Sequence, residues 1–202
     1  MTRPTVLVLA SGRGERFTAS GGRTPKLQAL LQGKTVLQHT LDAVRASGLP
    51  WHLEDAGHPG MGDSIAAAVR ATPQATGWLI LPGDLPLIHP DTLRAVAAAL
   101  ALNAAVVPMH QGQRGHPVGF SAACGPALLN LKGNKGAAPV LTTYNAFELI
   151  VNDVGCITDI DTLEDLRAAE QRLAAAVLAT PCYPSLRNDP RALHSRHIGR
   201  PP

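Results

Sequence analysis

The sequence predicts an α/β domain of three layers, in which helices cover both faces of a mostly parallel sheet. Short apolar runs at residues 6–10 and 78–81 are typical of buried parallel strands. Segments with apolar residues at helical spacing alternate with such runs, as expected for a sheet built by right-handed crossovers. The 202 residues, 45% of them hydrophobic, suffice for one packed domain, which we expect at residues 1–180.

The first predicted helix covers residues 34–47. Thr35 and Gln38 have the spacing of a capping box, and Gly48 is a typical helix stop. Short runs of strand-forming residues recur along the rest of the chain. They predict strands at residues 51–53, 105–109, 117–120 and 147–151.

Later helices are marked by their capping residues. Asp63 or Ser64 can cap a helix that Pro73 ends, and Pro90 can open the next one. Thr162 can cap a last helix whose apolar face holds Leu163, Leu166, Ala169 and Leu173. Shorter helical segments are expected at 122–131 and 135–143, and the composition of 181–202 predicts a mobile tail.

The charge of the chain does not favour nucleic-acid binding. The formal net charge is +3, and this excess falls in residues 181–202, so the predicted domain itself is balanced. Within the domain the signs separate: basic residues gather in 1–34 and acidic residues in 153–170. No apolar run is long enough for a membrane span or a secretory signal. Cys124, Cys156 and Cys182 form no CxxC pair, which excludes a disulfide scaffold and fits a cytoplasmic protein.

A glycine-bearing loop follows the first predicted strand directly, at Ser11, Gly12, Arg13 and Gly14. Such loops turn backbone N–H groups toward an anion, and nearby basic side chains can neutralise it. The spacing is neither a dinucleotide fingerprint nor a Walker A loop. A phosphate site and a solvated surface loop therefore both remain open interpretations at this point.

Carboxylates follow two other predicted elements. Asp84 lies between two prolines at the end of a strand, where a stiff backbone would fix its position. Asp159 and Asp161 precede the last helix, and their spacing in an extended segment points both to one side. Asp84 with Asp161 could hold the Mg²⁺ of a bound triphosphate. For Asp161 the alternative is a favourable place in the first helical turn, and for Asp159 we prefer that role or a supporting one.

Six motifs together resemble a known family. They are LASGRGERF followed by Lys26, GMGDS at 60–64, PGDLP at 82–86, RGHPVGF at 114–120, GNKGA at 133–137 and TDIDTLEDL at 158–166. Their order is that of the molybdenum-cofactor nucleotidyltransferases, and the chain resembles most closely the molybdopterin cytidylyltransferase-like branch, over residues 5–175. The resemblance implies a nucleotide-diphospho-sugar/NTP transferase-like fold and Mg²⁺-dependent transfer of a nucleoside monophosphate with release of pyrophosphate.

The resemblance also implies roles for individual residues. Arg16, Lys26 and Asp84 would be catalytic, and Asp84 and Asp161 would hold the metal. The nucleotide would contact Leu9, Ala10, Ser11, Gly12, Arg13, Gly14, Lys26, Gly60, Met61 and Ser64. The acceptor would face Gly115, His116 and Pro117, with His116 as either a phosphate or pterin ligand or a structural turn residue.

The chain departs from the family's pattern in three places. Ser11 replaces an alanine, and the loop leading to Lys26 is longer than usual. Residues 49–59 are too few for the strand and helix that family members place there. We therefore expect that one β–α unit is missing and that the strand at 51–53 pairs directly beside the first strand.

The expected reaction is attack by an acceptor phosphate oxygen on the α-phosphorus of CTP or GTP, with CTP favoured and molybdopterin as acceptor. A molybdoenzyme or its maturation chaperone could receive the product. Two other interpretations fit the same residues. One is a nucleotidyltransferase acting on a sugar phosphate or another small phosphorylated acceptor. The other is a protein that binds nucleotide or pterin without turnover.

Overall fold

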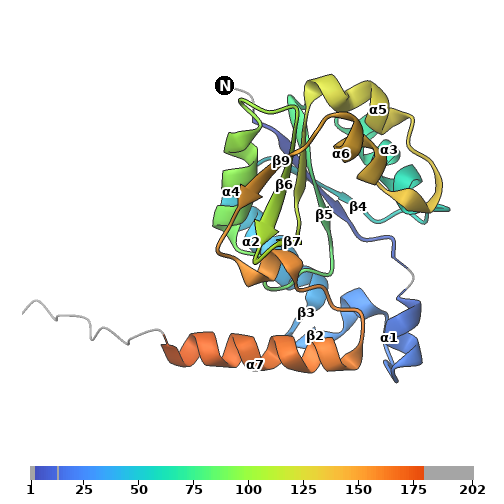
Figure 1. Ribbon diagram of the computed structural model, residues 1–202. Coiled ribbons are helices and arrows are strands. Elements are labelled where there is room, and N and C mark those ends of the chain that lie inside the picture. The colour runs from blue at the N-terminus through green and yellow to red at the C-terminus, as the bar shows by residue number, and fades with distance from the viewer. Residues whose placement is uncertain (1–2, 13, 180–202) are drawn as a thin grey trace, which may run out of the picture.

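The computed structural model describes residues 3–12 and 14–179, and it confirms the predicted three-layer α/β architecture (Figure 1). In this part of the chain seven strands form one sheet, in the order β4-β1-β5-β8-β6-β7, with β9 also paired to β6. Neighbouring pairs β1–β4, β1–β5 and β6–β9 are parallel, whereas β8 runs antiparallel between β5 and β6. The strands are β1 (Thr5–Leu9), β4 (Trp51–Glu54), β5 (Gly77–Pro82), β6 (Ala105–His110), β7 (Gln113–Arg114), β8 (Val118–Ser121) and β9 (Phe147–Ile150).

Side-chain alternation along β1 divides the core into two halves. Val6 and Val8 join the buried cluster beneath α2 (Val36–Ser47) and α4 (Pro90–Ala99). Leu7 and Leu9 point to the opposite face. That face is covered by α3 (Met61–Ala71), α5 (Gly125–Leu129) and α6 (Ala138–Thr143). Both faces of the sheet are therefore buried beneath helices, which explains why β1 is apolar along its whole length.

A third buried cluster lies below the sheet and joins the two ends of the described chain. Phe17 of α1 (Glu15–Ala19) packs there with Ala169 of α7 (Leu163–Ala179). The hairpin of β2 (Leu30–Leu31) and β3 (Lys34–Thr35) completes the cluster. Ser20 Oγ also accepts a hydrogen bond of 3.0 Å from Leu163 N. The sequence predicts the apolar face of α7 but neither α1 nor the hairpin.

Local capping signals place two helices correctly and a third wrongly. Thr35 and Gln38 form the predicted capping box, and Gly48 ends α2 at φ 69°. Pro90 is the first residue of α4. However, α3 begins at Met61 after Gly60, rather than behind a cap at Asp63 or Ser64. The Asp63 carboxylate instead accepts a hydrogen bond of 2.8 Å from Gly133 N.

The segment between α2 and α3 contains β4, which pairs in parallel with β1 as predicted. Residues 55–60 then lead directly into α3, so the structure has one strand and no helix in this segment. Turns of 3-10 helix occur at Lys26–Gln28 (η1), Ala122–Cys124 (η2), Gly133–Lys135 (η3) and Val154–Ile157 (η4). The predicted tail at 181–202 lies outside the described residues.

Candidate functional site

A cleft of about 710 Å³ opens beyond the carboxyl ends of β1 and β5. In sheets of this kind, ligands bind at these strand ends. Of the residues singled out from the sequence, those that line the cleft are Leu9, Ser11, Gly12, Arg16, Lys26, Gly60, Met61, Ser64, Asp84, His116, Asp159 and Asp161. Ala10, Gly14, Gly115 and Pro117 are chain neighbours of lining residues without lining the cleft themselves. Arg13 lies outside the described residues.

Backbone hydrogen bonds fix the loop that follows β1. Ala10 N donates to Glu54 O at 2.8 Å, and Leu9 O accepts from Gly83 N at 2.9 Å. Gly14 has φ +62°, a left-handed conformation that favours glycine and turns the chain into α1. The hydroxyls of Ser11 and Ser64 lie 2.8 Å apart and join this loop to α3. The start of this loop, at Ala10 and Ser11, is therefore fixed beside the cleft.

Lys26 connects segments that are far apart in the sequence. Its ammonium nitrogen donates to Asp84 Oδ2 at 2.6 Å and to Asp161 Oδ1 at 3.0 Å. Arg16 Nη1 reaches Asp161 Oδ2 at 2.7 Å, although the Arg16 side chain is 79% exposed. Burial lowers the pKa of Lys26, but the two carboxylates outweigh it, so that the pKa rises above its ordinary value. Lys26 is therefore a fixed positive charge at the floor of the cleft.

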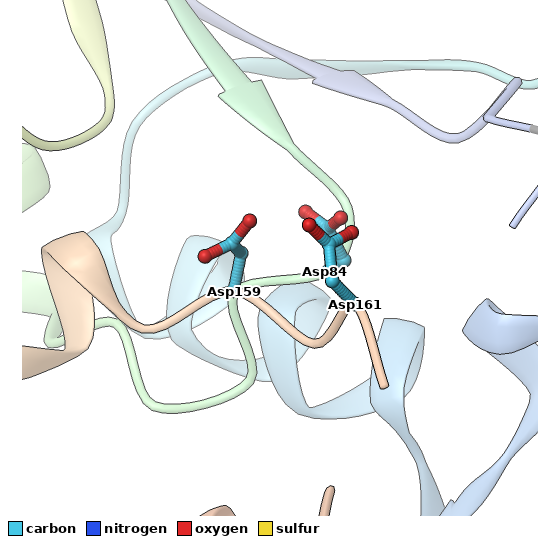
Figure 2. A group of neighbouring side chains, drawn as sticks. All are labelled: Asp84, Asp159 and Asp161. Atoms are coloured by element: carbon cyan, nitrogen blue, oxygen red, sulfur yellow. The ribbon is translucent and has the colours of Figure 1, made fainter. Parts of the chain in front are cut away.

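Three carboxylates gather beside Lys26. Oxygens of Asp84, Asp159 and Asp161 all lie within 4.8 Å of one another, and Figure 2 shows Asp84 and Asp161 side by side. Ile160 is fully buried, and its N–H donates to Asp84 O at 3.0 Å, which draws the flanking aspartates to the end of β5. The sequence predicts that Asp159 and Asp161 share a side, but it assigns the metal to Asp84 and Asp161 alone. The structure adds Asp159 to the group.

This group fits a divalent cation. Asp84 Oδ1 is buried without a hydrogen-bond partner in the described part of the chain, so one ligand oxygen remains available. Burial raises the pKa of Asp159, and repulsion from Asp161 and Asp84 raises it further, whereas Lys26 opposes the rise. Hard divalent cations prefer carboxylate oxygens. The residues present can therefore hold such an ion.

His116 lies across the cleft on the turn before β8. The backbone N–H of His116 donates to Cys156 O at 2.8 Å, and the peptide bond between His116 and Pro117 is cis. A Cβ on Gly115 would lie 2.6 Å from that same carbonyl oxygen, so the turn requires glycine there. Burial lowers the pKa of His116 despite the opposing effect of Asp84, so the ring is neutral near pH 7. Its Nδ1 is buried and lacks a partner among the described residues.

The start of α3 forms the remaining wall. Gly60 and Gly62 allow close approach of η3, because a Cβ on Gly60 would lie 2.4 Å from the carbonyl carbon of Gly133. The cleft also contains residues that the sequence analysis assigns no role, among them His58, Arg114 and Asn134. Arg114 and Asn134 fall within the quoted motifs, which could have drawn attention to them. A single histidine such as His58 gives no signal in the sequence.

Comparison with known proteins places this cleft in a family. Residues 41–147 match the MobA-like NTP transferase domain. The chain belongs to this family. The match begins after the glycine loop and ends before the acidic segment, so the site extends beyond the matched residues at both ends.

Individual curated proteins match parts of the chain. The purine catabolism protein PucB of Bacillus subtilis is 34% identical over 111 residues, covering 52% of this chain and 54% of PucB. The bifunctional protein GlmU of Desulfitobacterium hafniense is 30% identical over 109 residues, covering 44% of this chain and 23% of GlmU. The chain thus spans about a quarter of GlmU and about half of PucB.

A solved structure resembles nearly the whole described chain. Rv0371c from Mycobacterium tuberculosis has a TM-score of 0.71 at 26% identity, covering 84% of this chain and 98% of that one. Its complex with manganese has a TM-score of 0.67 at 25% identity, covering 84% and 99%. In this chain, Asp84, Asp159 and Asp161 form the acidic group that could hold a metal ion. No helix within residues 3–12 and 14–179 has the length and apolar character that crossing a membrane requires.

Proposed function

We propose that the protein is a Mg²⁺-dependent nucleotidyltransferase that joins a nucleoside monophosphate, with CMP favoured, to molybdopterin and releases pyrophosphate. The observation that carries this proposal is the contact of Lys26 with both Asp84 and Asp161, which are 58 and 135 residues away in the sequence. That contact brings the basic N-terminal segment and the acidic C-terminal segment into one cleft. Family membership supports transfer from a nucleoside triphosphate.

In this proposal the two ends of the site have different tasks. The loop of Ser11, Gly12 and Gly14 holds the nucleotide, while Arg16 and Lys26 neutralise the triphosphate and the departing pyrophosphate. Asp84 and Asp161, with Asp159 beside them, hold the Mg²⁺, which would supply further neutralisation of phosphate charge. Gly60, Met61 and Ser64 lie near the base.

The acceptor occupies the side of His116. The buried Nδ1 of His116 has no hydrogen-bond partner among the described residues, and a ligand can supply one. An acceptor phosphate oxygen attacks the α-phosphorus, and the bond from that phosphorus to the pyrophosphate oxygen breaks. A phosphate is already ionised near neutral pH, so no general base is required. Catalysis then depends on positioning and on charge neutralisation.

The test is pyrophosphate release from CTP, GTP, ATP and UTP with Mg²⁺ and molybdenum-loaded molybdopterin as acceptor. We expect release with CTP, and a loss of at least about 100-fold in Asp84→Asn. Asp42→Asn is the control, because Asp42 is an exposed acid that does not line the cleft. Release with a sugar phosphate instead would reassign the acceptor. Nucleotide binding without any release would favour a carrier.

A further inference from the structure

Glu54 is a buried acid at the last position of β4. It pairs in register with Leu9, and His52 pairs with Leu7, so both point to the sheet face that α3 covers. Glu54 is only 8% exposed. A carboxylate in such a place is unfavourable unless hydrogen bonds compensate for the water it has lost.

The bonds that compensate come from the loop leading to α3. Glu54 Oε1 accepts from His58 Nε2 at 3.0 Å and from Ala56 N at 3.3 Å. His52 Nε2 lies 3.5 Å from Oε2. Burial raises the pKa of Glu54, but these neighbours outweigh it and hold the pKa below its ordinary value. The carboxylate is therefore ionised and fixes the His58 ring.

His58 lines the cleft together with Pro59, Gly60 and Met61. An ionised carboxylate can only accept a hydrogen bond, so Nε2 of His58 must carry a hydrogen. In the neutral ring this leaves Nδ1 as an acceptor. Lys26 lies in η1 and the aspartates lie after β5 and before α7, whereas His58 lies before α3. A hydrogen-bond acceptor on that wall suits a nucleobase better than a phosphate.

We propose that His58, held by Glu54, is a specificity-determining residue that accepts a hydrogen bond from the exocyclic amino group of the nucleobase. It then favours cytosine over uracil, which carries an oxygen at the same position. The inference rests on the proposed function, because it assumes that a nucleotide occupies the cleft.

The experiment compares CTP and UTP binding with Mg²⁺ by titration calorimetry. One lost hydrogen bond corresponds to about a fivefold change in affinity. We expect the wild type to bind CTP at least about fivefold more tightly than UTP, and His58→Ala to bind both equally with unchanged UTP affinity. His89→Ala is the matched control, because His89 is exposed and does not line the cleft. The same ratio in His58→Ala as in the wild type would overturn the proposal.

Two further variants separate base recognition from a structural role. His58→Asn should retain part of the preference, because an amide oxygen can replace Nδ1. Glu54→Gln should reduce it, because an amide allows the His58 hydrogen to lie on either nitrogen. Equal ratios in all variants would refute the inference alone. A wild type that binds no nucleotide would refute the proposed function as well.

Discussion

The ammonium nitrogen of Lys26 lies 2.6 Å from Oδ2 of Asp84, with Asp161 Oδ1 only slightly farther away. A positive charge of the protein itself thus occupies one side of the carboxylate group, while Asp84 Oδ1 has no hydrogen-bond partner in the part of the chain that the structure describes. Lys26 neutralises the same acids that a divalent cation would bind. A metal ion arriving without nucleotide therefore meets both repulsion and competition from Lys26.

Lys26→Met should strengthen Mn²⁺ binding to the nucleotide-free protein by about tenfold, because it removes that competing charge. Electron paramagnetic resonance of free Mn²⁺ measures this directly. Lys34→Met is the control, since Lys34 forms an exposed ion pair with Asp42 outside the cleft. Unchanged or weaker Mn²⁺ binding in Lys26→Met would show that Lys26 does not compete with the metal.

Arg16→Gln should raise the KM for the nucleoside triphosphate by about tenfold and leave the thermal midpoint unchanged. The ion pair of Arg16 with Asp161 is largely exposed on the arginine side, and such pairs contribute little to stability. Steady-state kinetics and thermal unfolding measure the two effects. Arg45→Gln serves for comparison, because Arg45 also forms an exposed ion pair but does not line the cleft. Equal KM values for the two variants would argue against a role of Arg16 in triphosphate binding.

Gly60→Ala should lower the free energy of unfolding by about 2 kcal/mol, because the new Cβ collides with the backbone of Gly133. Nucleotide affinity should fall as well, since the start of α3 lines the cleft. Urea unfolding gives the stability change. Gly57→Ala is a close control three residues earlier, where a Cβ would meet nothing within 4 Å. If the two variants were equally stable, the packing of α3 against η3 would be looser than described.

Glu54→Gln should cost about 1 kcal/mol of stability at pH 7, with the difference disappearing in acid. The pKa of Glu54 is lower in the folded protein than in the unfolded chain. Its stabilising contribution is therefore present above the unfolded pKa and is lost as the pH falls through the folded pKa. Urea unfolding at several pH values tests this, with Asp55→Asn as the exposed neighbouring control. A difference that persisted in acid would indicate that packing, rather than charge, accounts for the loss.

Elements governed by local chemistry could be predicted from the sequence. The Thr35–Gln38 capping box and the apolar run of β1 depend on neighbouring residues, so their patterns are visible without tertiary structure. The position of Asp84 could also be predicted, because strand ends converge at one edge of a parallel sheet. The glycine loop beside Lys26 follows from the same rule.

The features that the sequence did not predict depend on contacts between residues that are distant in the sequence. Helix α3 begins directly after Gly60, where η3 packs closely, and that contact leaves no trace in the local sequence. Asp159 joins the acidic group through buried Ile160, whose N–H meets the Asp84 carbonyl. The role proposed for His58 depends on its hydrogen bond with Glu54, and the burial of Glu54 depends on the pairing of β4 with β1.

The packing of α1 against α7 beneath the sheet has a consequence for how the protein folds during synthesis. Asp161 contacts Lys26 and α7 packs against α1, so the proposed cation site uses residues from near both ends of the described chain. During translation the glycine loop leaves the ribosome long before its acidic counterpart exists. Ligand binding at the proposed site can therefore stabilise the fold only after α7 has left the ribosome.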